Sequence, residues 1–127
     1  MKRKILLVDD EESIIKSLIR VLNSIDNCEI MYTTDPDMVE TLIKEHNPDL
    51  IIADVMMPGA DGFEVVRRIK TNPSTQQVKI MSLSGNYPEG GKIMLESMGV
   101  IRCFDKPYNP EEFMQAVKDI ISGYIND

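Results

Sequence analysis

Five side chains that could take part in chemistry stand just after short apolar runs. They are Asp9 and Asp10 after residues 4–8, Asp54 after residues 50–53, Ser84 after residues 78–83 and Lys106 after residues 100–104. Three carboxylates supply the hard oxygen ligands that Mg²⁺ prefers. Asp54 could also act as a nucleophile, because carboxylates form acyl phosphates. The Ser84 hydroxyl and the Lys106 ammonium group would then neutralise phosphoryl oxygens, as phosphoryl transfer requires.

Each of these residues also has an ordinary structural explanation. Asp9-Asp10 could cap the following helix, Asp54 could cap the loop that follows it, and Ser84 could be a turn serine. Lys106 could be a solvated surface charge. The chemical interpretation therefore depends on convergence: if the apolar runs are parallel strands, their C-terminal ends share one edge of a sheet, where ligands bind.

The hydrophobic pattern predicts strands and helices in alternation. Short apolar runs predict strands over residues 4–8, 28–32, 50–53, 78–83 and 100–104. Helical spacing predicts helices over residues 11–25, 35–47, 61–70, 88–98 and 110–124. The predicted apolar stripes start at Ile14 in the first helix and at Met38 in the second, and Asp35 and Asn109 are the predicted N-caps of the second and fifth. Gly90 and Gly91 weaken the fourth helix, so a late start is expected there. Crossover helices between parallel strands predict an α/β fold, a doubly wound five-stranded parallel sheet with helices on both faces.

Composition limits the classes of function. The 127 residues fit a single domain covering residues 1–127, with no expected linker or second domain. The net charge of −7 argues against direct binding of nucleic acid. Apolar runs fall far short of the roughly 20 residues of a membrane helix, so no membrane contact is expected. Cys28 and Cys103 are too few for a disulfide framework, which favours a reducing, cytoplasmic setting.

Three segments together resemble the receiver domains of bacterial two-component response regulators, the CheY-like family. They are residues 6–11 (LLVDDE), 48–64 (PDLIIADVMMPGADGFE) and 104–108 (FDKPY). The resemblance covers the whole chain. It implies a flavodoxin-like fold and a signalling role. It also implies two kinds of partner, a sensor histidine kinase or phosphotransfer protein and a downstream output protein or domain.

The resemblance also implies roles for individual residues. Asp54 would accept the phosphoryl group from a phosphohistidine. Asp10, Asp54 and the backbone carbonyl of Met56 would bind Mg²⁺ directly, while Asp9 acts mainly through water. Ser84 would hold a phosphoryl oxygen and Lys106 would pair with the phosphate. Such a domain catalyses phosphoryl transfer only onto its own Asp54 and its own dephosphorylation, so it is not a conventional enzyme.

One position departs from the family pattern. Members usually carry Tyr or Phe three residues before the lysine, and the rotamer of that ring couples to the Ser or Thr; here the position holds Cys103. Period-2 alternation turns the neighbouring Phe104 to the opposite face of the sheet. We therefore expect the signal to pass from Ser84 through the following loop to residues 88–98. Asn86 and Tyr87 in this loop are expected to shape how water reaches the site.

Two alternatives remain at this point. A haloacid-dehalogenase-type phosphatase also uses a strand-end Asp and Mg²⁺, but its nucleophile belongs to an Asp-x-Asp motif after the first strand. This chain has Asp9-Asp10-Glu11 there. The second alternative is a degenerate receiver that only binds partners, which the substitution at Cys103 keeps open. Turnover of small phosphate esters would support the phosphatase, stoichiometric labelling of Asp54 would support the receiver, and no Mg²⁺-dependent labelling would support the degenerate receiver.

Overall fold

All five predicted strands are present, and they alternate with helices along the chain. The computed structural model describes residues 2–55 and 61–122. The strands are β1 (Arg3–Val8), β2 (Cys28–Thr33), β3 (Leu50–Ala53), β4 (Lys79–Ser84) and β5 (Arg102–Asp105). The helices are α1 (Glu12–Leu22), α2 (Val39–His46), α3 (Gly62–Thr71), α4 (Gly91–Ser97) and α5 (Pro110–Ser122), with a 3₁₀ turn η1 (Pro36–Met38) before α2.

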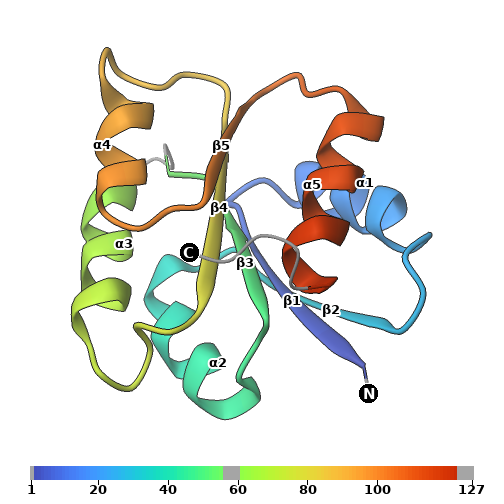
Figure 1. Cartoon of the computed structure of the whole chain (residues 1–127), viewed down its shortest axis with the longest axis horizontal. Helices are drawn as coiled ribbons and strands as arrows, with labels where there is room; N and C mark the ends of the chain where they lie inside the picture. Colours follow the sequence, from blue (N-terminus) through green and yellow to red (C-terminus); the bar gives the residue numbers. More distant parts are fainter. Residues whose placement is uncertain (1, 56–60, 123–127) are drawn as a thin grey trace.

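The strands form one parallel sheet in the order β2-β1-β3-β4-β5 (Figure 1). Val8 at the end of β1 pairs with Ala53 of β3, and Ala53 pairs with Ser82 of β4. Ser84 in turn pairs with Asp105 at the end of β5. The strand ends therefore lie along one edge, and the predicted doubly wound fold is confirmed.

Two hydrophobic cores cover the two faces of the sheet (Figure 1). Helices α1 and α5 lie on one face, and α2, α3 and α4 lie on the other. The central strand β3 is buried throughout and serves both cores: Leu50 and Ile52 belong to the first, Ile51 and Ala53 to the second. Full burial of a Leu or Ile side chain contributes about 1.5–3 kcal/mol, so β3 is firmly anchored beneath the residue that follows it, Asp54.

Several boundaries differ from the predicted ones. Helix α1 ends at Leu22 rather than at residue 25, and its most buried stripe is Ile15, Leu18 and Leu22 rather than one that starts at Ile14. Strand β5 begins at Arg102 instead of residue 100, because the Val100 N–H still donates to the carbonyl of Leu95 at the end of α4. Strand β4 ends at Ser84, one residue later than the predicted end at residue 83.

The helix starts follow the predicted capping residues. The Asp35 side chain accepts from the Asp37 N–H, and the Asn109 side chain accepts from the Glu112 N–H. Met38 was predicted to face inward but is 42% exposed, because it belongs to the 3₁₀ turn before α2. The late start of the fourth helix is confirmed: Gly90 has a φ of +75°, and α4 begins at Gly91.

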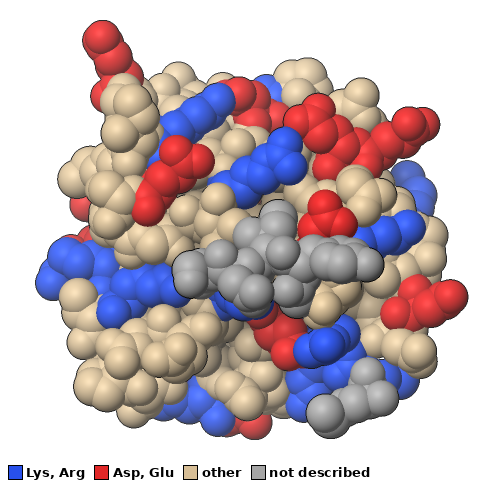
Figure 2. Space-filling view, in the orientation of Figure 1, with Lys and Arg blue, Asp and Glu red and all other residues tan. Residues whose placement is uncertain are grey.

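The surface mixes charges of both signs. On the face seen in Figure 2, Lys and Arg side chains lie among Asp and Glu side chains rather than in one continuous band. Within residues 2–55 and 61–122, no helix combines the length and apolar character needed to cross a membrane.

Candidate functional site

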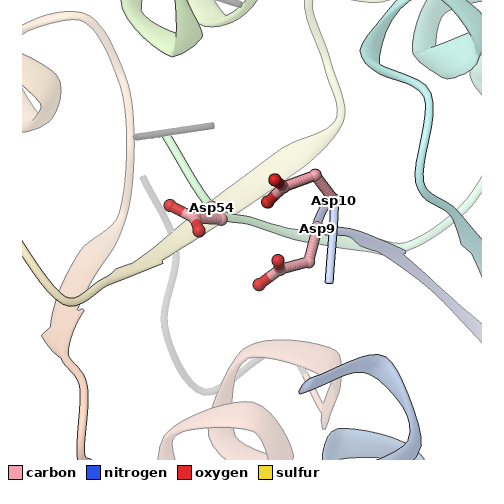
Figure 3. Close-up of side chains that lie close together, drawn as sticks. All are labelled: Asp9, Asp10 and Asp54. Atoms are coloured by element: carbon pink, nitrogen blue, oxygen red, sulfur yellow. The ribbon is translucent and has the colours of Figure 1, made fainter. Parts of the chain in front are cut away.

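Three carboxylates lie close together where the neighbouring strands β1 and β3 end. Asp9 and Asp10 follow β1 and Asp54 follows β3, and the Asp54 N–H donates to the carbonyl of Val8 at 2.9 Å, which fixes the two strand ends side by side. Each side chain has a carboxylate oxygen within 4.8 Å of one on both of the others (Figure 3). Asp9 and Asp54 are buried, whereas Asp10 is exposed. The predicted convergence of these residues is therefore present.

Lys106 joins the carboxylates from the end of β5. Its Nζ lies 2.9 Å from Asp9 Oδ2 and 3.1 Å from Asp54 Oδ2, and its side chain is only 18% exposed. Its backbone N–H donates to the carbonyl of Ser84 at 2.9 Å, which fixes the start of this segment against β4. The alternative interpretation of Lys106 as a solvated surface charge is wrong.

Burial and charge shape the proton affinities at the site. Burial raises the pKa of Asp9, and the hydrogen bonds that it accepts from Lys106 and from the Glu11 N–H offset this only in part. Burial acts to lower the pKa of Lys106, but hydrogen bonds and charge from Asp9 and Asp54 outweigh it and raise that pKa above its ordinary value. Lys106 is therefore an ammonium group at neutral pH.

The charges and donor atoms fit a divalent cation. When all three carboxylates are ionised, the single ammonium of Lys106 leaves a net charge of −2 at the cluster. Mg²⁺ takes one or two carboxylates together with water and phosphate oxygens, and an exposed ligand such as Asp10 leaves room for them. The predicted carbonyl ligand at Met56 lies outside the described residues, so its part in the site stays a prediction.

Ser84 stands at the end of β4 on the same edge of the sheet. It is fully buried, and its Oγ accepts a hydrogen bond from the Asn86 N–H at 3.3 Å. A hydroxyl that accepts in this way can still donate its own proton. The Ser84 side chain is therefore hydrogen-bonded to the connection that leads from β4 into α4. Its position and the position of that connection depend on each other.

Tyr87 forms a polar cluster with Ser82, the residue that pairs with Cys103 across β4 and β5. Cys103 packs in the core under α2, α3 and α4, whereas Phe104 packs in the core under α1 and α5, so the predicted alternation of these two residues is confirmed. Tyr87 turns inward and meets Ser82 and the Phe104 backbone. The sequence reasoning missed this contact. The signals that could have shown it are a small residue at 103 and a serine at 82 on the same face.

Comparisons with known proteins agree with this geometry. The family model described as "Response regulator receiver domain" matches residues 5–118. The phosphate regulon transcriptional regulatory protein PhoB of Pseudomonas aeruginosa is 29% identical over 121 residues, which are 95% of this chain and 53% of that protein. This chain thus spans about half the length of that curated relative.

Solved structures show the same fold. The signal receiver domain of a DNA-binding response regulator from Colwellia psychrerythraea has a TM-score of 0.88 at 25% identity, covering 95% of this chain and 99% of that one. The chemotaxis response regulator CheY4 of Vibrio cholerae has a TM-score of 0.81 at 25% identity, covering 94% and 99%.

The haloacid-dehalogenase alternative is thereby set aside, because the family match spans nearly the whole chain. Phosphorylation and Mg²⁺ binding are properties of the matched family, whose members act in signalling rather than as conventional enzymes. The chain belongs to the response regulator receiver domains of two-component signal transduction systems.

Proposed function

We propose that Asp54 accepts a phosphoryl group from a sensor histidine kinase or a phosphotransfer protein and passes the signal on through partner binding. The observation that carries this proposal is the position of Lys106, whose Nζ lies within 3.1 Å of both Asp9 and Asp54 in a buried setting. Asp54 thus has a cation beside the oxygen that would bear the phosphoryl group.

The transfer needs little chemistry from the protein beyond positioning. An oxygen of the Asp54 carboxylate attacks phosphorus, the P–O bond forms, and the P–N bond to the donor histidine breaks. Lys106 turns from the carboxylate to a phosphoryl oxygen. The Ser84 hydroxyl donates to a second phosphoryl oxygen. Charge-assisted hydrogen bonds of this kind are stronger than neutral ones.

Asp10 and Asp54 would hold Mg²⁺ directly, and Asp9 would act on it mainly through water. When bound, the cation neutralises charge on the transferred phosphoryl group. Asp9 keeps Lys106 in place through the 2.9 Å contact with its Nζ. Asp9 also accepts from the Glu11 N–H at 3.0 Å, so the carboxylate is held from two sides.

The partners follow from the family role. The relatives include transcriptional regulators about twice as long as this chain, so we infer that the downstream partner is an output domain or a separate output protein. Direct contact with nucleic acid is not part of the proposal, given the net charge of −7. Cys28 and Cys103 are both free thiols, which is compatible with a reducing, cytoplasmic setting.

The test is labelling of the intact protein with acetyl phosphate and Mg²⁺, followed by mass measurement. Wild type should gain the mass of one phosphoryl group, and Asp54→Asn should gain none. Asp9→Asn should be labelled more slowly, because Lys106 loses one of its two carboxylate partners. Asp35→Asn is the matched control, since Asp35 is exposed and Asn also caps helices well; it should label like wild type.

Two results would contradict the proposal in different ways. Full labelling of Asp54→Asn would mean that another residue accepts the phosphoryl group. A wild type that takes up no phosphoryl group in Mg²⁺ would support the degenerate receiver that only binds partners.

A further inference from the structure

Tyr87 ties the connection between β4 and α4 to both neighbouring strands. Its hydroxyl donates to the Phe104 carbonyl of β5 at 3.0 Å and lies 2.8 Å from Ser82 Oγ of β4. A phenol has a single proton, so with that proton on the Phe104 carbonyl the Ser82 hydroxyl must be the donor in the second bond. Burial raises the pKa of Tyr87, so the phenol keeps its proton at neutral pH. We call these two bonds the Tyr87 bridge.

The small side chain of Cys103 lies on β5 opposite Ser82, which forms one of the two bonds of the Tyr87 bridge. Cys103 pairs with Ser82 in the β4–β5 register, and both residues contribute to the surroundings of the Tyr87 ring. The ring packs against the core under α2, α3 and α4, and Lys92 Nζ of α4 lies 5.4 Å from its centroid. Tyr87 therefore links β4, β5 and the start of α4.

The bridge is coupled to Ser84 through a short piece of backbone. Tyr87 is three residues after Ser84, and between them the Asn86 N–H donates to Ser84 Oγ. If Ser84 moves toward a phosphoryl oxygen on Asp54, residues 85–87 should move with it, because the Asn86 N–H is bonded to Ser84 Oγ. The Tyr87 bridge consists of neutral hydrogen bonds, which contribute less than the charge-assisted bond that a phosphoryl oxygen offers to Ser84.

We propose that Tyr87 is a positioning residue that holds the β4–α4 connection in the arrangement of the unphosphorylated chain and is released when Asp54 is phosphorylated. The proposal rests on the proposed function, since it requires a phosphoryl group at Asp54. A ligand shifts an equilibrium only by binding one state better than the other. Here the bridge favours the unphosphorylated state, and the phosphoryl group favours the state in which Ser84 has moved.

The test measures affinity for beryllofluoride, which stands in for the phosphoryl group, by ¹⁹F NMR titration in Mg²⁺. Tyr87→Phe keeps the ring and removes the bridge, so the unphosphorylated arrangement loses its advantage. Beryllofluoride should then bind about fivefold more tightly than to wild type. Tyr32→Phe is the control, because Tyr32 is exposed on the far edge strand β2; its affinity should equal that of wild type.

The outcomes separate this proposal from its alternatives. A purely structural role, with the bridge kept in both states, predicts a lower melting temperature for Tyr87→Phe with unchanged affinity, and this result would overturn the proposal. Weaker binding by Tyr87→Phe would overturn it as well, since the hydroxyl would then support the bound state. If wild type binds no beryllofluoride and takes up no phosphoryl group, the proposed function itself fails.

A second variant tests whether the two bonds act as one unit. Ser82→Ala removes the donor to the Tyr87 oxygen and should also tighten beryllofluoride binding, by less than Tyr87→Phe. The double variant should bind like Tyr87→Phe alone, because the same bridge is lost in both. Fully additive effects would show that Ser82 acts independently of Tyr87 and would overturn the bridge as the holding element.

Discussion

Helices α3 and α4 cover the same face of the sheet, but they are anchored very differently. Helix α3 begins at Gly62 and is capped by Asp61, whose side chain accepts from the backbone N–H groups of Phe63 and Glu64. It buries Val65, Val66 and Ile69 against the sheet. Its last turn is followed by a loop in which the Thr75 hydroxyl donates to the carbonyl of Ile69 at 2.7 Å.

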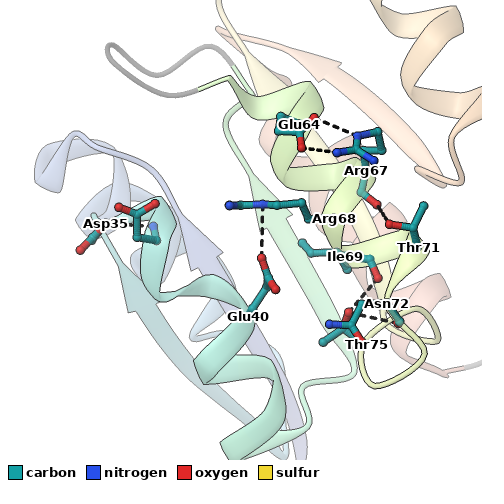
Figure 4. A network of polar contacts seen from close by, with 10 residues as sticks. Asp35, Glu40, Glu64, Arg67, Arg68, Ile69, Thr71, Asn72 and Thr75 are labelled. Carbon is teal, nitrogen blue, oxygen red and sulfur yellow. Dashed lines mark hydrogen bonds and ion pairs between the residues drawn. The ribbon is translucent and has the colours of Figure 1, made fainter.

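A polar network surrounds α3 on its outer side (Figure 4). Arg68 pairs with Glu40 of α2 at 3.3 Å, and Arg67 pairs with Glu64 one turn earlier. The Thr71 hydroxyl donates to the carbonyl of Arg67. Exposed ion pairs contribute only about 0–1 kcal/mol each. The main anchors of α3 are therefore its cap and its buried side chains, and the network adds a connection to α2.

Helix α4 is shorter and has weaker anchors. It starts after Gly90, which makes no side-chain capping bond, and it buries only Gly91 and Leu95. Ile93 is 75% exposed and Met94 is 54% exposed. Its ion pair, Lys92 with Asp105, lies at the surface. Elements with few buried contacts open most readily, so α4 is the less stable of the two helices.

The difference in anchoring between α3 and α4 matches the different roles proposed for Asp54 and Ser84. The firmly anchored helix α3 comes after β3 and Asp54, and the weakly anchored helix α4 comes after β4, which ends at Ser84. Under the proposed function, Asp54 would therefore accept the phosphoryl group on the firmly anchored side, and Ser84 would sense it on the weakly anchored side. If Ser84 moves as proposed, little buried surface in α4 would resist the change, because that helix buries only Gly91 and Leu95.

The largest expected effect comes from one glycine at the start of α3. A Cβ on Gly62 would lie 2.3 Å from the Val55 carbonyl oxygen, which is backbone and cannot turn away. Gly62→Ala should lower the free energy of unfolding by about 3 kcal/mol, measured by urea denaturation. The matched control is Gly85→Ala after β4, where the new Cβ would meet only Lys106 Cβ at 3.8 Å; it should change stability by less than about 1 kcal/mol.

Equal losses in the free energy of unfolding from Gly62→Ala and Gly85→Ala would contradict the proposed difference between the two helix starts. They would show that the β4–α4 connection is packed as tightly as the start of α3. If Gly62→Ala does not fold, the yield of folded protein replaces the denaturation midpoint as the measurement, and Gly85→Ala should still fold normally.

The sequence predicted the strands and the converging side chains, because both depend on local patterns. Buried parallel strands appear as short apolar runs; Asp54 follows one of them directly, and Lys106 follows another with one residue between. The phase of α1 was harder to predict: with isoleucines at both 14 and 15, spacing alone does not say which faces the core. The inward turn of Tyr87 depends on its hydrogen bonds to Ser82 of β4 and to the Phe104 carbonyl of β5, which no local sequence pattern reports.

The next prediction concerns Mg²⁺, which should stabilise the part of the site formed by the ends of β1 and β3. Among the described residues, the carboxylates of the cluster come from the ends of β1 and β3, not from the β4–α4 connection. Mg²⁺ at ten times its dissociation constant should raise the free energy of unfolding by about 1.4 kcal/mol. Asp10→Asn should lose most of this gain. Asp105→Asn, an exposed carboxylate at the same edge but on β5, should keep it.

The measurement is urea denaturation with Mg²⁺ and with chelator. A gain that survives in Asp10→Asn but disappears in Asp105→Asn would place the cation on the Ser84 side of the edge. The difference in anchoring between α3 and α4 would then need an explanation other than metal binding.

The smallest effect compares the two helix starts directly. The Asp61 side chain lies 3.0 Å from the Phe63 N and 3.3 Å from the Glu64 N, and loss of such a cap costs about 1 kcal/mol. Asp61→Ala should therefore lower the free energy of unfolding by about that amount, while Asp61→Asn should keep most of it, because Asn caps as well as Asp. Glu89→Ala, just before the uncapped start of α4, should change stability by less than about 0.5 kcal/mol.

Hydrogen exchange would locate these changes. Asp61→Ala should speed exchange at the first amides of α3 and bring them closer to the rates in α4, because the cap is what separates the two helix starts. If Glu89→Ala speeds exchange in α4 as much as Asp61→Ala does in α3, then Glu89 supports α4 in solution. In that case α4 would be held at its start as α3 is, and its readiness to move would have to come from its exposed face alone.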